Sequence, residues 1–154
     1  MDLGVHLVDL LLWTLDFPAV ETVSSDLFAG GRRLADVDGA VEDYAVATLG
    51  LSGGLVARVA CSWRLHAGRE AEISATFHGT RGSVAFHNLG GSFYDFRAEL
   101  RRGTCSEVLV DPPDAWGGRA AVDWIERVSA GCGFDPDAER ILLVAQVLDR
   151  IYGR

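Results

Sequence analysis

Apolar and polar side chains alternate over the first fifteen residues with the period of a helix. Because one helical turn takes about 3.6 residues, positions three or four apart share a face. The stretch "DLGVHLVDLLLW" therefore predicts a helix, with one stripe formed by Asp2, His6, Asp9 and Trp13. We expect five leucines to supply most of its buried side: Leu3, Leu7, Leu10, Leu11 and Leu15. An acid, imidazole and acid on an otherwise apolar helix need a functional explanation.

After this helix, the pattern changes to that of successive strands. Period two is clearest at 71–78, where Ala71, Ile73, Ala75 and Phe77 alternate with Glu72, Ser74 and Thr76. Turn sequences such as "AGGRR", "SGG", "GTRG" and Arg102-Gly103 separate the segments. The predicted strands are 20–28, 42–51, 55–63, 71–78, 83–86, 92–98 and 104–110. Because short strands follow one another through tight turns, the sheet should be mainly antiparallel.

Two more helices are expected after the strands. The first runs from 119 to about 130, where "AGCG" ends it. The second begins near Asp135, a suitable N-cap, with Pro136 at the first helical position. Four of its residues recur at helical spacing: Ile141, Ala145, Leu148 and Tyr152. The order of elements predicts one α+β domain over residues 1–154, with one large, mainly antiparallel open sheet and helices packed on one face.

Composition excludes several classes of protein. The 154 residues are 49% hydrophobic, enough for the core of one domain. A net charge of −8 repels the phosphates of nucleic acid. The apolar run 3–15 is shorter than the roughly 20 residues that a membrane span needs, and it lacks the basic flank of a signal peptide. Three scattered cysteines, Cys61, Cys105 and Cys132, predict reduced thiols in a soluble, cytoplasmic protein.

His6 is the first candidate for chemistry. The carboxylate of Asp2, one turn away, can hold the imidazole in one tautomer and raise its basicity, as in a general base. A histidine satisfied by a neighbour on a half-buried helix is the structural alternative. Asp2, His6 and Asp9 also offer mixed nitrogen and oxygen ligands. However, the remaining histidines, His66, His78 and His87, have no spacing that links them to His6, so we expect no metal site.

The other signals are weaker or negative. Trp63, Arg64 and His66 follow a predicted strand and could contact a polar ligand, although such a cluster is more often an edge strand with a solvated arginine. All 14 basic residues are arginine, which excludes a P-loop and any chemistry that needs a lysine of this chain. The sequence contains no glycine-rich dinucleotide loop between a strand and a helix, and no nucleophile elbow.

Four stretches together resemble a known family: "DLGVHLVDLLLW", "GGLVARVACSW", "ATFHGTRGSVAF" and "GFDPDAERILLVAQVLDRIY". They are similar to the second domain of the glucose–fructose oxidoreductase / inositol dehydrogenase / MocA-like (Gfo/Idh/MocA) family, over essentially the whole chain. The resemblance implies an NAD(P)-dependent dehydrogenase with an N-terminal Rossmann domain. It also implies that His6, partnered by Asp2, is the general base on the substrate hydroxyl while a hydride passes to the nicotinamide.

We therefore hypothesise that the chain is the substrate-binding and catalytic half of an oxidoreductase that acts on a sugar, polyol or similar hydroxy compound. We assign Asp9 and Arg64 to substrate binding. NAD or NADP is expected on a Rossmann domain that these residues do not contain, supplied in cis or in trans, and the family's catalytic lysine belongs to that domain too. We also expect homo-oligomers through the open sheet face, and neither nucleic acid nor membrane as a partner. The alternative is a non-catalytic oligomerisation or ligand-binding sheet module.

Overall fold

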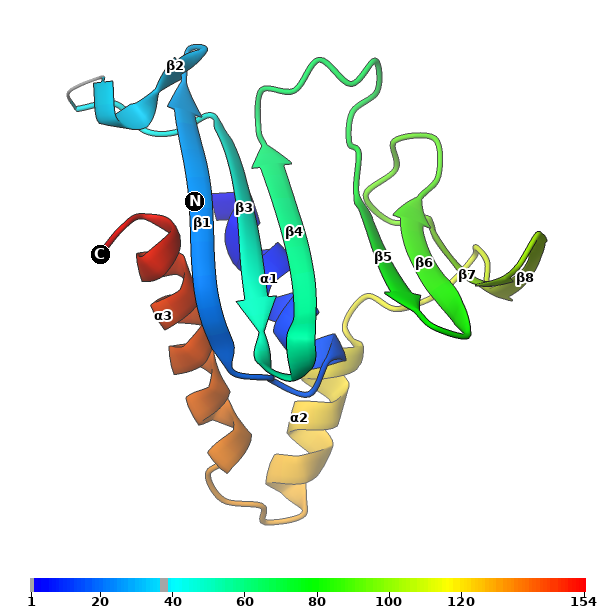
Figure 1. The fold of residues 1–154 in the computed structure, drawn as a ribbon. Helices are drawn as coiled ribbons and strands as arrows, with labels where there is room; N and C mark the ends of the chain where they lie inside the picture. The colour runs from blue at the N-terminus through cyan, green and yellow to red at the C-terminus, as the bar shows by residue number, and fades with distance from the viewer. Residues whose placement is uncertain (1, 37–38) are drawn as a thin grey trace. The chain divides into compact units, whose positions relative to one another are not determined.

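The computed structural model describes residues 2–36 and 39–154, except for the side chains of Asp2 and Asp36. The predicted α+β class is confirmed, because three α-helices and eight antiparallel strands form within the described residues (Figure 1). The chain divides into two compact units. The first comprises the chain up to Leu65 together with Phe134–Arg154, and the second is His66–Gly133.

The strands form two four-stranded sheets, which corrects the single large sheet that we expected. The first has the order β2-β1-β3-β4, from β1 (Val20–Ala29), β2 (Arg32–Arg33), β3 (Tyr44–Leu51) and β4 (Leu55–Ser62). The second has the order β5-β6-β7-β8, from β5 (Ser74–Gly79), β6 (Gly82–Asn88), β7 (Phe96–Arg102) and β8 (Cys105–Val110). The division falls at 63–73, where a longer connection replaces the tight turns that join neighbours such as β3 and β4.

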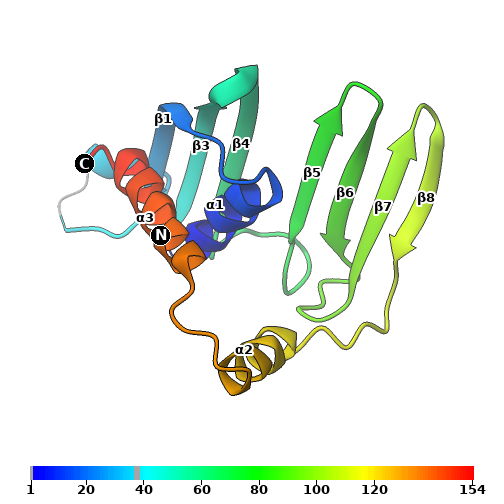
Figure 2. The same cartoon turned by 90° about the horizontal axis from the view of Figure 1, so that it is seen from below.

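The core of the first unit lies between its sheet and two helices. α1 (Asp2–Thr14) and α3 (Arg140–Ile151) lie side by side on one face of the sheet (Figures 1 and 2). Register places Leu49 opposite both Val23 and Ala57, so these three side chains face the helices together. The buried cluster consists of Val8, Leu12, Ala47, Leu49, Leu51, Val144, Val147 and Ile151.

Two predicted helix faces need correction. On α1 the fully buried side chains are Val8 and Leu12, whereas Leu3 is exposed. Leucines lie almost all round α1, so the sequence pattern cannot decide which of them meets the sheet. Asp135 is the predicted N-cap, and its carboxylate accepts a hydrogen bond from the Asp137 amide (3.0 Å). It begins the 3₁₀ turn Pro136–Glu139 that leads into α3, whose buried residues are Val144, Val147 and Ile151 rather than those of the predicted stripe.

The second unit confirms the predicted alternation. Ala75 and Phe77 are half-buried on one face of β5, while Ser74 and Thr76 are exposed on the other. β7 starts later than the predicted 92–98, and Ser92 explains why. Its hydroxyl oxygen accepts hydrogen bonds from the amides of Tyr94 and Asp95 (both 3.1 Å), which folds this segment into a turn instead of a strand.

The last element of the second unit is α2 (Arg119–Ser129), the first of the two predicted C-terminal helices. The helix is confirmed, but its expected packing is not, because none of its residues is buried. In the described part of the chain, no helix has the length and hydrophobicity needed to cross a membrane.

Asn88 joins three segments of the second unit. Its side chain is buried, accepts from the Ile73 amide (3.0 Å), and donates to the carbonyls of Ala71 (3.1 Å) and Ser92 (2.9 Å). We expect Asn88→Ala to lower the free energy of unfolding by about 1–3 kcal/mol, because buried backbone groups lose their partners. Urea denaturation followed by circular dichroism measures this change. Exposed Ser74→Ala on β5 is the control, and an equal loss in both variants would contradict the role of Asn88.

Candidate functional site

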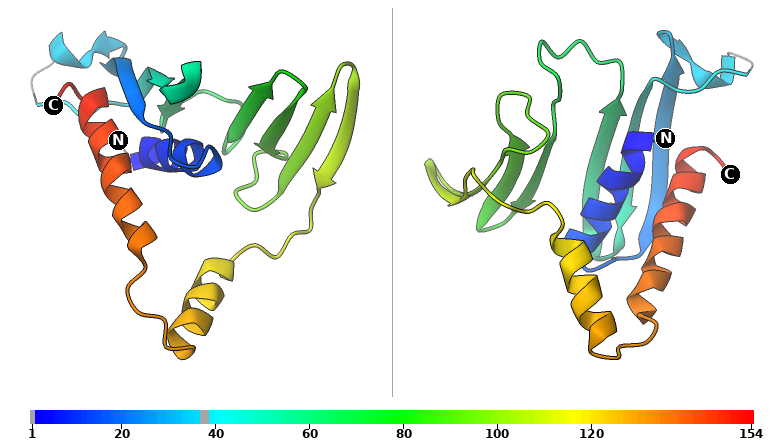
Figure 3. Two further views of the ribbon diagram at one scale, coloured as in Figure 1. Left: turned by 60° about the horizontal axis from the view of Figure 1, so that its bottom comes forward. Right: turned by 180° about the vertical axis from the view of Figure 1, so that it is seen from behind.

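The polar stripe of α1 lies on the protein surface. His6 and Asp9 are exposed, and so is Trp13, whereas Val8 and Leu12 are buried on the opposite side of the helix. Figure 3, seen from behind, shows α1 beside α3 over the first sheet. The stripe is therefore open to a ligand or to another domain. Asp2 begins the helix, but its side chain lies outside the described residues, so its pairing with His6 stays a prediction.

The helices that carry the stripe also expose large apolar side chains. Among the described residues, these are Leu3, Trp13, Ile141, Leu142 and Leu143. Scattered apolar residues are normal on a surface, but a group of this size on two adjacent helices is typical of a surface that another protein surface covers. His6 therefore lies on a surface of α1 and α3 that is suited to contact with a further domain.

Arg64 follows the end of β4 and is held there by two neighbours. Its guanidinium carbon lies 4.7 Å from the centroid of the Trp63 ring, and its Nη1 is 3.8 Å from Asp43 Oδ2. Neither partner belongs to α1, so these contacts do not unite Arg64 with His6 and Asp9. The assignments of Asp9 and Arg64 to substrate binding stay predictions.

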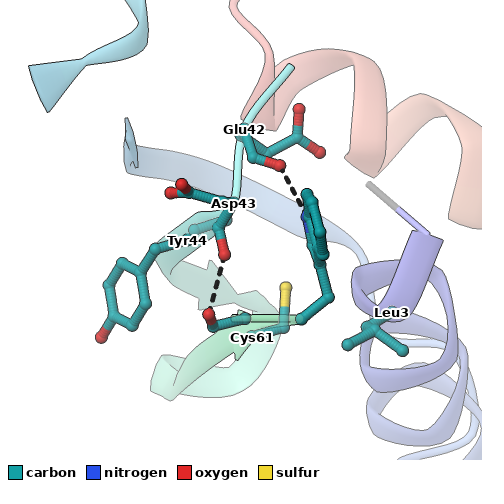
Figure 4. A pocket seen from close by; sticks show the side chains of 8 residues that line it. Leu3, Glu42, Asp43, Tyr44 and Cys61 are labelled. Carbon is teal, nitrogen blue, oxygen red and sulfur yellow. Dashed lines mark hydrogen bonds between the residues drawn. The ribbon is translucent and has the colours of Figure 1, made fainter. Parts of the chain in front are cut away.

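A hollow beside the first turn of α1 was not foreseen from the sequence (Figure 4). It is lined by Leu3, Glu42, Asp43, Tyr44, Ala45, Cys61, Ser62 and Trp63. The Trp63 indole donates to the Glu42 carbonyl (3.1 Å), and the Ser62 hydroxyl donates to the Asp43 carbonyl (2.8 Å). Both bonds fix the end of β4 against the segment that enters β3.

Glu42 is the most deeply buried charged residue among those described, with 8% of its surface exposed. The phenol of Tyr152, just after α3, donates to its carboxylate over 2.5 Å. Burial is the main cause that raises the pKa of Tyr152, and the hydrogen bond to the Glu42 carboxylate raises it further. Burial raises the pKa of the Cys61 thiol, and the Glu42 charge raises it further, which favours the neutral thiol over the thiolate. Glu42 was predicted as the first residue of a strand, and no sequence pattern pairs its carboxylate with the Tyr152 phenol.

We expect Tyr152→Phe to lower the free energy of unfolding by about 1–3 kcal/mol near neutral pH, because the buried carboxylate loses a donor. The raised pKa of Tyr152 means that its contribution is complete below about pH 10, where the phenol of the unfolded chain ionises. It is lost as pH rises further. The difference between wild type and variant in urea denaturation should therefore shrink above that pH. A difference that stays constant to higher pH would contradict the coupling.

Metal ligation has no geometric support in the described part of the chain, where no three His, Cys, Asp or Glu side chains come close enough to share an ion.

Three helices and two antiparallel four-stranded sheets within the described residues define the class of fold, an α+β domain. The family described as the GFO/IDH/MocA C-terminal domain matches residues 1–85, more than half of the sequence, and the chain belongs to this family. A comparison with curated proteins finds no match.

Solved structures share the fold at low sequence identity. A candidate oxidoreductase from Thermotoga maritima is 17% identical with a TM-score of 0.68, over 94% of this chain and 41% of that one. An Agrobacterium radiobacter oxidoreductase in complex with NAD⁺, L-tartaric acid and magnesium is 20% identical with a TM-score of 0.60, over 99% of this chain and 46% of that one. Levoglucosan dehydrogenase in complex with NADH and L-sorbose is 18% identical with a TM-score of 0.56, over 85% of this chain and 42% of that one. This chain spans less than half the length of each.

Proposed function

We propose that this chain is the substrate-binding and catalytic half of an NAD(P)-dependent oxidoreductase acting on a sugar, polyol or similar hydroxy compound. The observation that carries the proposal is the position of His6. Its side chain is exposed on α1, and large apolar side chains of α1 and α3 are exposed as well. Membership of an oxidoreductase domain family supports it. The ligands named with two structural neighbours, L-sorbose and L-tartaric acid, are both small hydroxy compounds and support the substrate class.

In the proposed reaction, the His6 imidazole accepts the proton of the substrate hydroxyl as the carbon beside it is oxidised. Asp2 orients the imidazole and stabilises the imidazolium that forms. Asp9, on the same stripe, accepts a hydrogen bond from a second hydroxyl, and Arg64 donates to an oxygen of the substrate. The cofactor supplies the hydride acceptor.

The cofactor needs a second domain, because the 154 residues contain no glycine-rich loop that would cradle its phosphates. We infer that a Rossmann domain, in cis or in trans, covers the apolar outer side of α1 and α3 and brings the nicotinamide to His6. The chain's length, less than half that of its structural neighbours, supports this inference. The free thiols of Cys61, Cys105 and Cys132 support a cytoplasmic location.

A binding experiment tests this assignment without turnover. The protein that combines this chain with its Rossmann domain is loaded with NADH, and a panel of sugars, polyols and hydroxy acids is added. We expect a binding compound to shift the NMR signals of His6, Asp9 and Trp13, and to leave Val56 on β4 unchanged. Binding that leaves the α1 signals unchanged would favour the alternative, a non-catalytic ligand-binding module.

We also propose that the chain forms a dimer through the face of the first sheet that the helices leave open. Register places Thr48 opposite Arg58, and Val46 opposite Ala60, on this face. Phe28 and Tyr44 add two rings whose centroids are 6.1 Å apart. A twofold contact covers such a mixed surface with a single self-complementary patch.

We expect light scattering to give the wild-type chain a mass near twice 16.6 kDa, and Val46→Glu to give a monomer, since the contact would then take a carboxylate of each copy out of water. Leu142→Glu, on the outer side of α3, is the matched control and should keep the wild-type mass. A monomeric wild type at about 100 μM, far above the micromolar dissociation constant of an ordinary complex, would contradict the proposal.

A further inference from the structure

The second unit has an apolar sheet face that no residue of its only helix covers. Cross-strand pairing places Ala75 beside Phe86 and Phe77 beside Val84, and the row continues onto β7. We define the apolar face as Ala75, Phe77, Val84, Phe86, Ala98 and Leu100. None of these six side chains is fully buried, and Val84, on the inner strand β6, is 39% exposed. A sheet normally buries its apolar face against a second layer.

α2 presents the matching surface within the same unit. Its apolar side chains fall on one side of the helix, at Val122, Trp124, Ile125 and Val128, and each is 50–65% exposed. Asp123 and Glu126 occupy the opposite side. A helix of this amphipathic character is stabilised mainly by packing its apolar side, and α2 has no buried residue.

The connection to α2 is already anchored at the apolar face. The Trp116 ring packs edge-on against Phe96 at 6.2 Å, and its indole donates to the Tyr94 carbonyl (2.9 Å). Phe96 stacks in turn on Phe86 of the apolar face, with centroids 4.7 Å apart. The chain between β8 and α2 is therefore fixed at one end of this face.

Two glycines follow the anchor directly. Gly117 and Gly118 separate Trp116 from α2, and Gly118 has a φ of 82°. No atom lies within 4 Å of the position that a Cβ would take at either glycine. Both glycines therefore lie in open space, and glycine has the widest choice of backbone angles of any residue.

We propose that α2 is a strap that turns about Gly117–Gly118 and packs its apolar side onto the apolar face of the second sheet. The sizes agree, because eleven helical residues span about 16 Å and strands of six or seven residues about 20 Å. The closed strap removes two complementary apolar surfaces from water in one step. The open strap leaves both available, so the unit has two states that a partner on either surface can select.

Disulfide trapping tests the strap. In a chain with Cys61, Cys105 and Cys132 replaced by serine, Ile125→Cys is combined with Val84→Cys. We expect air oxidation to give an intramolecular disulfide, since closure places both side chains in the same interface between helix and sheet. Asp123→Cys with Val84→Cys is the matched control and should oxidise at least ten times more slowly. Equal rates, no bond, or a bond only between two chains would overturn the proposal.

Thiol alkylation is a second test that leaves the sheet unchanged. With single substitutions on α2, Ile125→Cys should react at least ten times more slowly with iodoacetamide than Asp123→Cys, at every protein concentration. Equal rates would show that α2 stays open. Protection of Ile125→Cys that depends on concentration would assign the cover to a second copy, and this result would also overturn the strap.

Discussion

His6→Ala should lower the turnover of the complete enzyme about 10²- to 10⁴-fold, the usual contribution of a positioned general base. The imidazole lies on the exposed side of α1, so its removal takes away the proposed proton acceptor without opening the core. Substrate binding should change much less, because the proposed substrate ligands Asp9 and Arg64 stay in place. Steady-state kinetics with this chain and its Rossmann domain together measure kcat and KM separately.

Two comparisons make the result specific to the base. Asp2→Asn should reduce kcat by less than His6→Ala, because it disturbs orientation and basicity while the imidazole remains. Thr14→Ala, also exposed on α1, should leave kcat near the wild-type value. Unchanged turnover in His6→Ala would remove the catalytic assignment, whatever the other variants do.

Leu49→Ala should lower the free energy of unfolding of the chain by about 3–5 kcal/mol. Leu49 is completely buried on β3, between Val23 and Ala57 and beneath the helices. Truncation removes buried apolar surface and leaves a cavity that a close-packed interior fills only in part. Urea denaturation followed by circular dichroism measures the change.

Ile141→Ala is the matched control, because this side chain of α3 is 69% exposed and should cost less than about 0.5 kcal/mol. Similar losses at both positions would show that Leu49 is not at the centre of the core. A loss confined to Leu49 would confirm that α1 and α3 cover this face of the sheet.

The hairpin turns could be predicted from the sequence because each contains glycine residues. Gly30 and Gly31 join β1 to β2, and Gly53 and Gly54 join β3 to β4, all with positive φ. Such angles favour glycine strongly, so the turn residues carry their own signature. The N-cap at Asp135 was readable for the same local reason, since one side chain bonds an amide two residues away.

Contacts between distant parts of the chain could not be predicted from the sequence. Glu42 and Tyr152 are 110 positions apart, and nothing local predicts their bond. The buried side of α1 depends on how the helix meets the sheet, and its many leucines fit several orientations. The single sheet was an error of the same kind, because a strand pattern does not specify which edges pair. The shared side of His6 and Asp9 on α1 follows from helical spacing alone, whereas their roles in a site stay predictions.

We propose that this chain supplies the catalytic half of a hydroxy-compound oxidoreductase. The formation of NADH or NADPH with a panel of sugars, polyols and hydroxy acids tests this function, comparing the Rossmann domain alone with the Rossmann domain joined to this chain. We expect cofactor reduction with at least one compound only when this chain is present, and its loss with His6→Ala. Equal reduction by the Rossmann domain alone, or none across the panel with both present, would contradict the proposed function.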